Sequence, residues 1–280
     1  MAQPETWGPV LNLPGGSNTA MKSATQLQDG RILVTWRTVT DGVNVQAMIL
    51  NADGTVAKPA FKVNQREGDM GIPEPIVLSN GDFAIVYHQK NPTNAYNLVW
   101  HRFTPEGISL GETAIQKTAG DPVESVVATP NGGFAISYTS QMPDGFYAIS
   151  QLLVDAQGNQ TESLIYKPGT NDRYYLQDTE SLTVGQSVTL LAHVHWNGSS
   201  WENSIGFDLR FNGAQTRGFS TIAPFELNNG ASAKVVALST GQFAIVWNSL
   251  ADGIVGHLRG IRATGERGIL DRFGCRTAEI

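Results

Sequence analysis

The chain has one cysteine, few charges and no long apolar run. Cys275 alone cannot form an intrachain disulfide, and it excludes metal and redox motifs that need two cysteines. Only 16% of the residues are charged, and 19 Lys and Arg against 25 Asp and Glu give a net charge of −6. A chain without a basic field attracts neither phosphate backbones nor anionic lipid, which excludes a nucleic-acid partner.

No apolar stretch reaches the roughly 18 residues of a membrane span, so no membrane insertion is expected. The amino terminus, MAQPETWGPV, lacks the basic start and apolar core of a signal peptide, and we expect none in this chain. What the chain does have is 30 glycines and 13 prolines spread throughout, with 41% hydrophobic residues. This profile is typical of short strands joined by tight turns, and it excludes disorder and a helical bundle.

The sequence repeats itself five times around one glycine turn. The five segments are QDGRILVTW (28–36), SNGDFAIVY (79–87), PNGGFAISY (130–138), TVGQSVTLL (183–191) and STGQFAIVW (239–247). Their turn glycines, spaced 51, 51, 53 and 56 residues apart, are Gly30, Gly81, Gly132, Gly185 and Gly241. A second glycine turn recurs inside each repeat, at Gly54, Gly107, Gly158, Gly213 and Gly265. Two landmarks in the same order five times indicate a repeat architecture.

Each repeat reads as a meander of four short strands. In the second repeat the expected strands are Pro75–Leu78, Phe83–Tyr87, Leu98–Phe103 and Ala114–Lys117. The second of these is apolar at successive positions, which predicts that both faces of its sheet are buried. Four-stranded units of about 51 to 56 residues with two apolar faces predict an all-β fold, a five-bladed β-propeller with four antiparallel strands per blade.

We expect a single domain over residues 1–280. Its blades are expected at residues 14–64, 65–117, 118–167, 168–223 and 224–273. Residues 7–13 stand where a fourth strand belongs, so they are expected to pair with the last blade and close the ring, removing exposed edges. Residues 268–273 also read as the fourth strand of the last blade. Two segments therefore compete for that outer edge.

The repeated aromatic residues are predicted to pack between blades. They are Trp36, Phe83, Tyr87, Phe134, Tyr138, Phe243 and Trp247. The Asp-Gly and Asn-Gly turns are assigned to turn geometry, because DGVNVQAMI and its counterparts lack the several oxygen ligands that a calcium loop of about 12 residues supplies. Calcium is the weaker alternative, and no cofactor is expected.

The fourth repeat departs most from the common pattern. We expect function on the propeller face that carries the long, dissimilar connections, because variable loops on a rigid scaffold carry sites. In the fourth repeat the longest loops are expected at residues 167–179 and 194–204. A sugar offers an apolar face and a ring of hydroxyls, which suits aromatic and charged side chains. The predicted ligand-binding residues are Arg173, Tyr174, Tyr175, Trp196, Trp201 and Glu202. The alternative is that the two tryptophans only cap a loop.

His193 and His195 form an HxH pair, whose side chains share one face of a strand, as two metal ligands do. The other three histidines, His88, His101 and His257, lie in other repeats and offer no third ligand at a fixed place. We therefore interpret the pair as structural and predict no metal site.

A unit of the form L-x-x-G-x-F-x-I-x-W, followed by an extended strand, D-x-x-G and a Val-Asn pair, describes the repeat. Residues 27–64 are one copy, with Ile32, Val34 and Asn51 at the Phe, Ile and Asp positions. This unit resembles the propeller-like repeats of secreted bacterial adhesin and calcium-repeat proteins, and the resemblance covers nearly all of the chain. The expected architecture is similar to that of five-bladed lectins of the tachylectin-2 type. The resemblance implies a secreted, extracellular protein, and it is a structural signature rather than a functional motif.

Five-bladed propellers also include glycosidases, which need two carboxyl groups near each other. Seven residues before each turn glycine stands a polar residue: Ser23, Glu74, Ser125, Asp178 and Lys234. For an enzyme, Glu74 and Asp178 are the catalytic candidates, with Lys234 to perturb them. A polysaccharide lyase would instead combine His193 or Tyr175 as a base with Arg173 to neutralise a uronate.

Three functions therefore remain open, and the first is preferred because no catalytic constellation repeats. The chain is expected to be a carbohydrate-binding, lectin-like module that acts through the face with long loops. The alternative is a polysaccharide-degrading enzyme, a glycoside hydrolase or lyase, with its site at the channel mouth. The third is a structural propeller that contacts protein in a larger extracellular or virion assembly.

Overall fold

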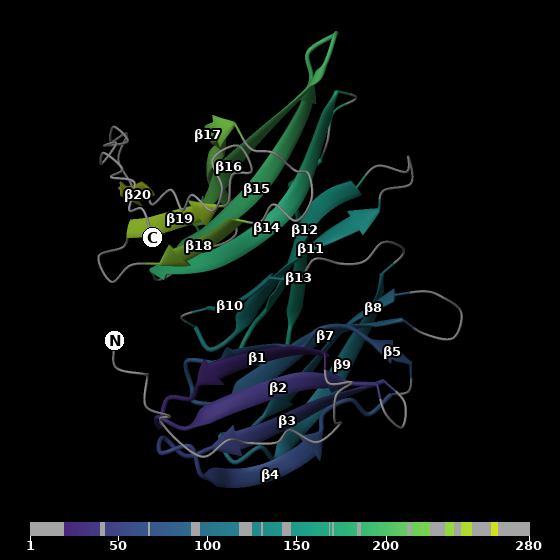
Figure 1. Cartoon of the computed structure of the whole chain (residues 1–280), viewed down its shortest axis with the longest axis vertical. Coiled ribbons are helices and arrows are strands. Elements are labelled where there is room, and N and C mark those ends of the chain that lie inside the picture. The colour runs from purple at the N-terminus through teal and green to yellow at the C-terminus, as the bar shows by residue number, and fades with distance from the viewer. Residues whose placement is uncertain are drawn as a thin grey trace, which may run out of the picture. The chain divides into compact units, whose positions relative to one another are not determined.

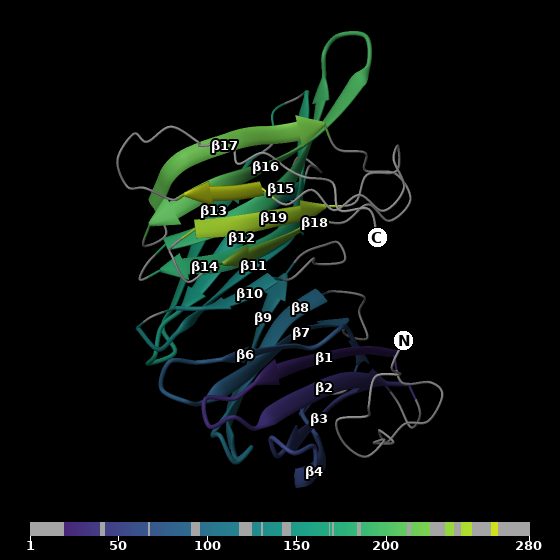
Figure 2. The same ribbon diagram turned by 60° about the vertical axis from the view of Figure 1, so that its left-hand side comes forward.

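The computed structural model describes residues 20–39, 43–66, 68–90, 96–117, 125–129, 131–141, 147–167, 169, 171–183, 186–211, 214–224, 233–237, 242–247 and 259–262. These residues form twenty strands in five antiparallel sheets (Figures 1 and 2). None of them forms a helix long and apolar enough to span a bilayer. The chain divides into two compact units, Met1–Ala128 with Gly132–Phe134, and Thr129–Asn131 with Ala135–Ile280. Both segments expected to close the ring, 7–13 and 268–273, lie outside the described residues.

The first two sheets belong to the first unit. In the first sheet the order is β1 (Ala20–Gln26), β2 (Ile32–Thr38), β3 (Asn44–Leu50) and β4 (Val56–Lys62). The second contains β5 (Asp69–Met70), β6 (Glu74–Val77), β7 (Phe83–Lys90), β8 (Tyr96–Phe103) and β9 (Ser109–Lys117). Both β5 and β6 pair with β7, so the first strand of this sheet is present in two pieces. The four strands expected in the second repeat are confirmed.

The other three sheets follow in chain order. The third is β10 (Ser125–Ala128), β11 (Phe134–Gln141), β12 (Tyr147–Val154) and β13 (Gln160–Tyr166). The fourth is β14 (Asp172–Thr183), β15 (Gln186–Trp196), β16 (Trp201–Phe211) and β17 (Ala214–Pro224). The fifth is β18 (Ala233–Ala237), β19 (Gln242–Trp247) and β20 (Arg259–Arg262). Each repeat of the sequence thus corresponds to one sheet.

The two recurring glycine turns share one backbone geometry. In the turn between β1 and β2, Gly30 donates its N–H to the Leu27 carbonyl at 3.0 Å and has φ of 87°. In the turn between β3 and β4, Gly54 donates to Asn51 at 2.9 Å with φ of 82°. A side chain rarely adopts such a positive φ, which explains why glycine recurs here. The same sign of φ is found at Gly81, Gly107, Gly132 and Gly158.

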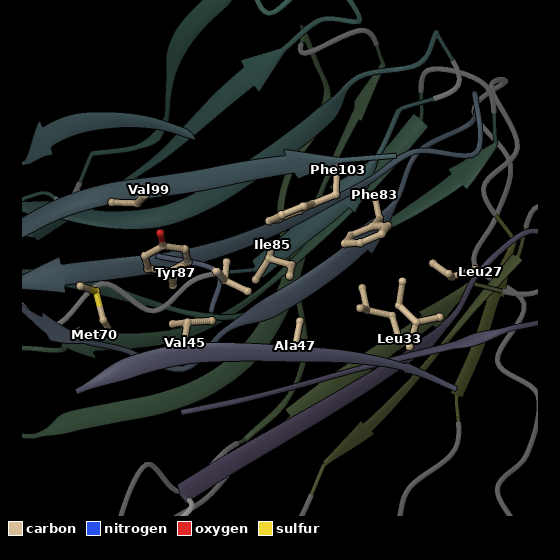
Figure 3. Packing of buried hydrophobic residues seen from close by; sticks show 12 residues of the cluster. Leu27, Leu33, Val45, Ala47, Met70, Phe83, Ile85, Tyr87, Val99 and Phe103 are labelled. Atoms are coloured by element: carbon tan, nitrogen blue, oxygen red, sulfur yellow. The ribbon is translucent and has the colours of Figure 1, made fainter. Parts of the chain in front are cut away.

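The core of the first unit lies between its two sheets (Figure 3). Leu33, Val45 and Ala47 of the first sheet contact a cluster that includes Phe83 and Ile85 of the second, and all five are fully buried. Phe83 stacks on Phe103, with ring centroids 5.2 Å apart. Every residue of β7 from Phe83 to Tyr87 is buried, so both faces of this sheet are covered, as the unbroken apolar run predicts.

The fourth sheet, in the second unit, is also buried on both faces. On one face, Tyr174 and Leu191 pack against Ile149 and Ile165 of the third sheet. On the other face, the side chains of β15 and β16 pack against the fifth sheet, in a cluster of Val188, Leu190, Ala192, Ile205, Phe207, Ala233, Val235, Phe243 and Ile245. Of the repeated aromatics predicted to pack between blades, Trp36, Phe83, Tyr87, Phe134, Tyr138 and Phe243 are at most 1% exposed. Packing between two sheets is confirmed for Phe83, Tyr87 and Phe243. The side chain of Trp247 lies outside the described residues.

In two sheets a buried tyrosine of the second strand is hydrogen-bonded to a glutamate of the fourth strand. The Tyr87 hydroxyl of β7 donates to Glu112 Oε2 of β9 at 2.7 Å, and Tyr138 of β11 donates to Glu162 of β13 in the same way. Glu112 also accepts hydrogen bonds from the Gln65 N–H and the Arg66 side chain. Burial and the neighbouring carboxylate raise the pKa of both tyrosines, which therefore stay neutral donors.

Replacing Phe83 or Phe243 with alanine should lower the free energy of unfolding by about 3–5 kcal/mol, because each ring is fully buried between sheets. Urea denaturation measures the loss. Val236→Ala is the matched control, because Val236 is 49% exposed and should lose less than about 1 kcal/mol. A phenylalanine variant no less stable than this control would contradict the packing.

The first unit should lose stability as the pH falls through about 6.5. Burial lowers the pKa of His101 from its ordinary value, against the opposing effects of the Val63 carbonyl and Glu112. The unfolded chain therefore binds this proton first. His101 contributes its full stability above about pH 6.5 and loses it progressively below that pH. Urea denaturation from about pH 8 to pH 5 should show a steeper decline for the wild type than for His101→Gln, and parallel curves would refute the assignment.

Candidate functional site

The connections that frame the candidate site are shorter than the sequence predicts. Residues 167–179 and 194–204 were expected as long loops, but β14 begins at Asp172, β15 ends at Trp196 and β16 begins at Trp201. The connection between β15 and β16 is only residues 197–200, and this hairpin extends past the other strands of its unit (Figures 1 and 2). The ends of these strands protrude from the core and carry polar and aromatic residues. Their composition therefore resembles that of a loop, which is why the sequence predicted loops here.

Strand register separates the predicted site residues onto two faces of the hairpin. Asp172 is opposite His195, Tyr174 is opposite His193, and Arg173 is opposite Val194. Trp196 is opposite Trp201, and His195 is opposite Glu202. Successive side chains of a strand point to opposite faces. In β15 the two histidines, at odd positions, therefore lie on one face, and Trp196, at an even position, lies on the other.

The first group of residues, which we call the aromatic face, consists of Arg173, Tyr175, Trp196 and Trp201. The two indole rings are 5.3 Å apart, and the Arg173 guanidinium lies 4.8 Å from the centroid of the Trp201 ring. Trp201 is 45% exposed and Tyr175 is 42% exposed, so large apolar surfaces meet solvent beside a cation. Four of the six predicted ligand-binding residues therefore lie on one surface.

A β-bulge adds Asp178 to the aromatic face. The register between β14 and β15 shifts after Leu176, so that Leu176 is opposite Leu191 but Asp178 is opposite Leu190. Leu190 packs toward the fifth sheet, and Asp178 points the same way. Its carboxylate accepts a hydrogen bond from the Val235 N–H at 3.1 Å and forms an ion pair with Lys234 Nζ at 3.3 Å. Lys234, which was expected to act on Glu74 and Asp178, thus lies beside Asp178.

The opposite face carries a cluster of Asp172, His193 and His195, which we call the histidine cluster. His193 Nε2 and His195 Nδ1 both lie 2.8 Å from the same oxygen, Asp172 Oδ1. Burial alone raises the pKa of Asp172, but the hydrogen bonds and charges of the two histidines outweigh it and leave that pKa below its ordinary value. Asp172 is the third group of this cluster, and its place with the two histidines was not predicted from the sequence. Its only signal is the cross-strand register, which a linear spacing does not show.

Two predicted ligand-binding residues lie apart from the aromatic face. Tyr174 is 6% exposed and stacks on His193 with ring centroids 4.4 Å apart, and its hydroxyl oxygen accepts a hydrogen bond from the Tyr166 hydroxyl at 2.8 Å. Tyr174 thus packs in the core beside the third sheet, and its contact with a ligand stays a prediction. Glu202 is exposed and accepts a hydrogen bond from the Asn197 side chain at 2.5 Å, on the face of the histidine cluster.

The enzyme candidates are also distributed differently from the prediction. His193 and Arg173 were combined as base and neutralising cation, but the register places them on opposite faces, so only Tyr175 shares a face with Arg173. Glu74 lies in β6 of the first unit and Asp178 lies in β14 of the second. All five residues of the predicted polar set lie in the first strands of their sheets: Ser23 in β1, Glu74 in β6, Ser125 in β10, Asp178 in β14 and Lys234 in β18.

No family model matches the sequence, and no curated protein matches it either. Solved structures do match. An α-L-arabinanase from Penicillium chrysogenum, in complex with arabinobiose, is 12% identical, with coverage of 89% of this chain and 91% of its own, at a TM-score of 0.50. The arabinofuranosidase Arb93A from Fusarium graminearum, in complex with an iminosugar inhibitor, is 9% identical, with coverage of 88% and 89% and a TM-score of 0.51.

The NanB sialidase from Streptococcus pneumoniae is 9% identical at a TM-score of 0.59, and the match covers 96% of this chain and 63% of the sialidase. At such low identities the likeness concerns the fold alone. Together with the five consecutive antiparallel sheets, it shows that the chain is an all-β protein with the fold of a five-bladed β-propeller.

Asp178 and Lys234 should contribute unequally to stability. Lys234 is 69% exposed, so Lys234→Ala should change the free energy of unfolding by less than about 1 kcal/mol. Asp178→Ala should lose about 1–3 kcal/mol, because it leaves the part-buried Val235 N–H without its acceptor. Urea denaturation compares the two, and equal losses would contradict the role of the backbone hydrogen bond.

Proposed function

We propose that this protein is a carbohydrate-active propeller that binds a polysaccharide along the aromatic face and cleaves it. The observation that carries the proposal is the β14 bulge, which brings Asp178 onto the same sheet face as Arg173, Tyr175 and Trp201. Asp178 then lies in the inner part of β14, Tyr175 and Arg173 lie closer to its outer end, and Trp201 of β16 lies beside Arg173.

The aromatic face has the chemistry that a glycan needs. An exposed indole stacks on the apolar face of a sugar ring, and the neighbouring guanidinium donates hydrogen bonds to hydroxyls or to a uronate. Arg173 and Asp178 are five residues apart, about 16 Å at roughly 3.3 Å per residue, so a ligand that reaches both groups is a chain of several sugars rather than a single sugar.

Cleavage is supported by the three enzymes that share the fold and by the position of Asp178. In a hydrolase one carboxylate attacks the sugar carbon or stabilises its positive charge, while a second acidic group protonates the oxygen that leaves; Asp178 fits the first of these roles. The Val235 N–H and Lys234 hold the Asp178 carboxylate in place for that role. In a lyase, Tyr175 would remove the proton beside a uronate that Arg173 neutralises.

The second candidate is lectin-like binding without cleavage, which the exposed aromatic face by itself favours. A protein partner is the third, because exposed tryptophan and arginine also anchor protein interfaces. We also propose that the protein is extracellular. A polysaccharide ligand and the resemblance to repeats of secreted adhesins both support this location.

Removal of the aromatic rings should abolish glycan binding without unfolding the protein. The double variant Trp196→Ala with Trp201→Ala is measured on a polysaccharide array and by calorimetry with the best ligand. Loss of one stacked ring costs roughly 1–3 kcal/mol by analogy with base stacking, so the double variant should bind at least about 30-fold more weakly. Leu164→Ala, which removes an exposed side chain of β13, is the control. Unchanged affinity in the double variant would refute this binding surface.

Cleavage is tested by incubating the protein with the polysaccharides that bind. New reducing ends indicate hydrolysis, and the ultraviolet absorbance of an unsaturated uronate indicates elimination. Asp178→Asn should lower the rate of hydrolysis by at least about 100-fold while glycan affinity persists. Tyr175→Phe should do the same to elimination. Binding without any product would replace the enzyme with the lectin-like candidate, and a blank array would favour a protein partner.

A further inference from the structure

We propose that Asp172, His193 and His195 form a binding site for one divalent transition-metal ion, with zinc as the preferred ion. This inference does not rest on the proposed function, because the histidine cluster occupies the sheet face opposite the aromatic face.

The three side chains converge as ligands of one ion do. Asp172 Oδ1, His193 Nε2 and His195 Nδ1 lie within 4.8 Å of one another. In a tetrahedral zinc site with bonds of about 2.0–2.2 Å, neighbouring ligand atoms are roughly 3.4 Å apart, so small rotations of the side chains suffice. Each neutral imidazole has one N–H, and both rings approach the same carboxylate oxygen. When a dication binds among them, each ring offers the lone pair of this nitrogen and carries its proton on the other ring nitrogen, and the ion keeps the carboxylate paired.

The scaffold holds the ligands in this arrangement. Asp172 and His195 are directly cross-strand neighbours, and His193 is on the same face two residues away. The His193 ring stacks on Tyr174 at an interplanar angle of 11°, and the Tyr174 hydroxyl is bonded to Tyr166. Ligands on paired strands, with one ring fixed by an outer partner, give a site that is formed before the ion arrives.

The donor set and its exposure select the kind of ion. Two imidazoles with one carboxylate suit zinc and its first-row neighbours, whereas calcium and magnesium prefer oxygen ligands only. Among the described residues this is the one group of three such side chains that converge. The His195 side chain is 43% exposed and Asp172 is 33% exposed, so an ion can enter from solvent. Three protein ligands leave a fourth position for water or for an oxygen of a ligand.

The test uses the full-length protein, stripped with a chelator and dialysed. Co²⁺ is titrated while the visible absorbance is recorded, because cobalt in a tetrahedral site absorbs far more strongly than hydrated cobalt. The wild type should bind one Co²⁺ per chain, and Zn²⁺ should displace it. Asp172→Asn and His193→Ala should each weaken Zn²⁺ binding in calorimetry by more than the roughly 10–100-fold that loss of an outer partner costs. His88→Gln, which removes a histidine of the first unit, should bind as the wild type does.

Should a variant fail to fold, the wild type still tests the site by chemical modification. Diethyl pyrocarbonate should modify His195 in the metal-free protein, and stoichiometric Zn²⁺ should protect it, as measured by mass spectrometry. A wild type without a saturable Co²⁺ spectrum, equal Zn²⁺ affinity in His193→Ala, or His195 unprotected by Zn²⁺ would overturn the proposal. None of these results depends on glycan binding or cleavage, so failure of this site leaves the proposed function standing, and the reverse also holds.

Discussion

Burial of both faces of a sheet is the constraint on which the rest of this structure depends. A sheet with one wet face alternates apolar and polar residues, but Phe83 to Tyr87 of β7 are all buried. Leu190, Leu191 and Ala192 of β15 are likewise fully buried, although neighbours in a strand point to opposite faces. Such strands are stable only between two other sheets, so one blade has no complete core without its neighbours. Repetition of the unit meets this requirement.

The same packing leaves the ends of long strands free for other chemistry. The fourth sheet has strands of 11 or 12 residues, longer than the others. Their inner parts pack between the third and fifth sheets, while the ends near Trp196 and Trp201 extend beyond that core. The fourth sheet also has Leu191 where the second and third have Tyr87 and Tyr138, so it cannot form their hydrogen bond between tyrosine and glutamate. Where repeated packing residues are lost, side chains suited to a ligand take their place.

One strand presents two surfaces because of alternation and one irregularity. Alternation places Arg173 on the aromatic face and Asp172 with the histidines on the other. The bulge after Leu176 then reverses the order, so Asp178 joins Arg173 instead of Tyr174. Without that extra residue, Asp178 would point toward the third sheet and would have neither the Val235 N–H nor Lys234 as partner. A shift of one residue in register thus decides which groups can act together.

Much of the fold was determined by the sequence itself, because glycine spacing and apolar runs are local signals. Gly30 and Gly81 predict turns of positive φ, and the unbroken run from Phe83 to Tyr87 predicts burial on both faces. The residues of the candidate site were also recognisable by type, from Arg173 to Trp201. Their grouping was decided only by the tertiary structure: Tyr174 is buried, His193 is separated from Arg173, and Asp172 joins the two histidines. Cross-strand register and bulges depend on contacts between distant segments, and linear spacing carries no record of which residue will lie opposite another.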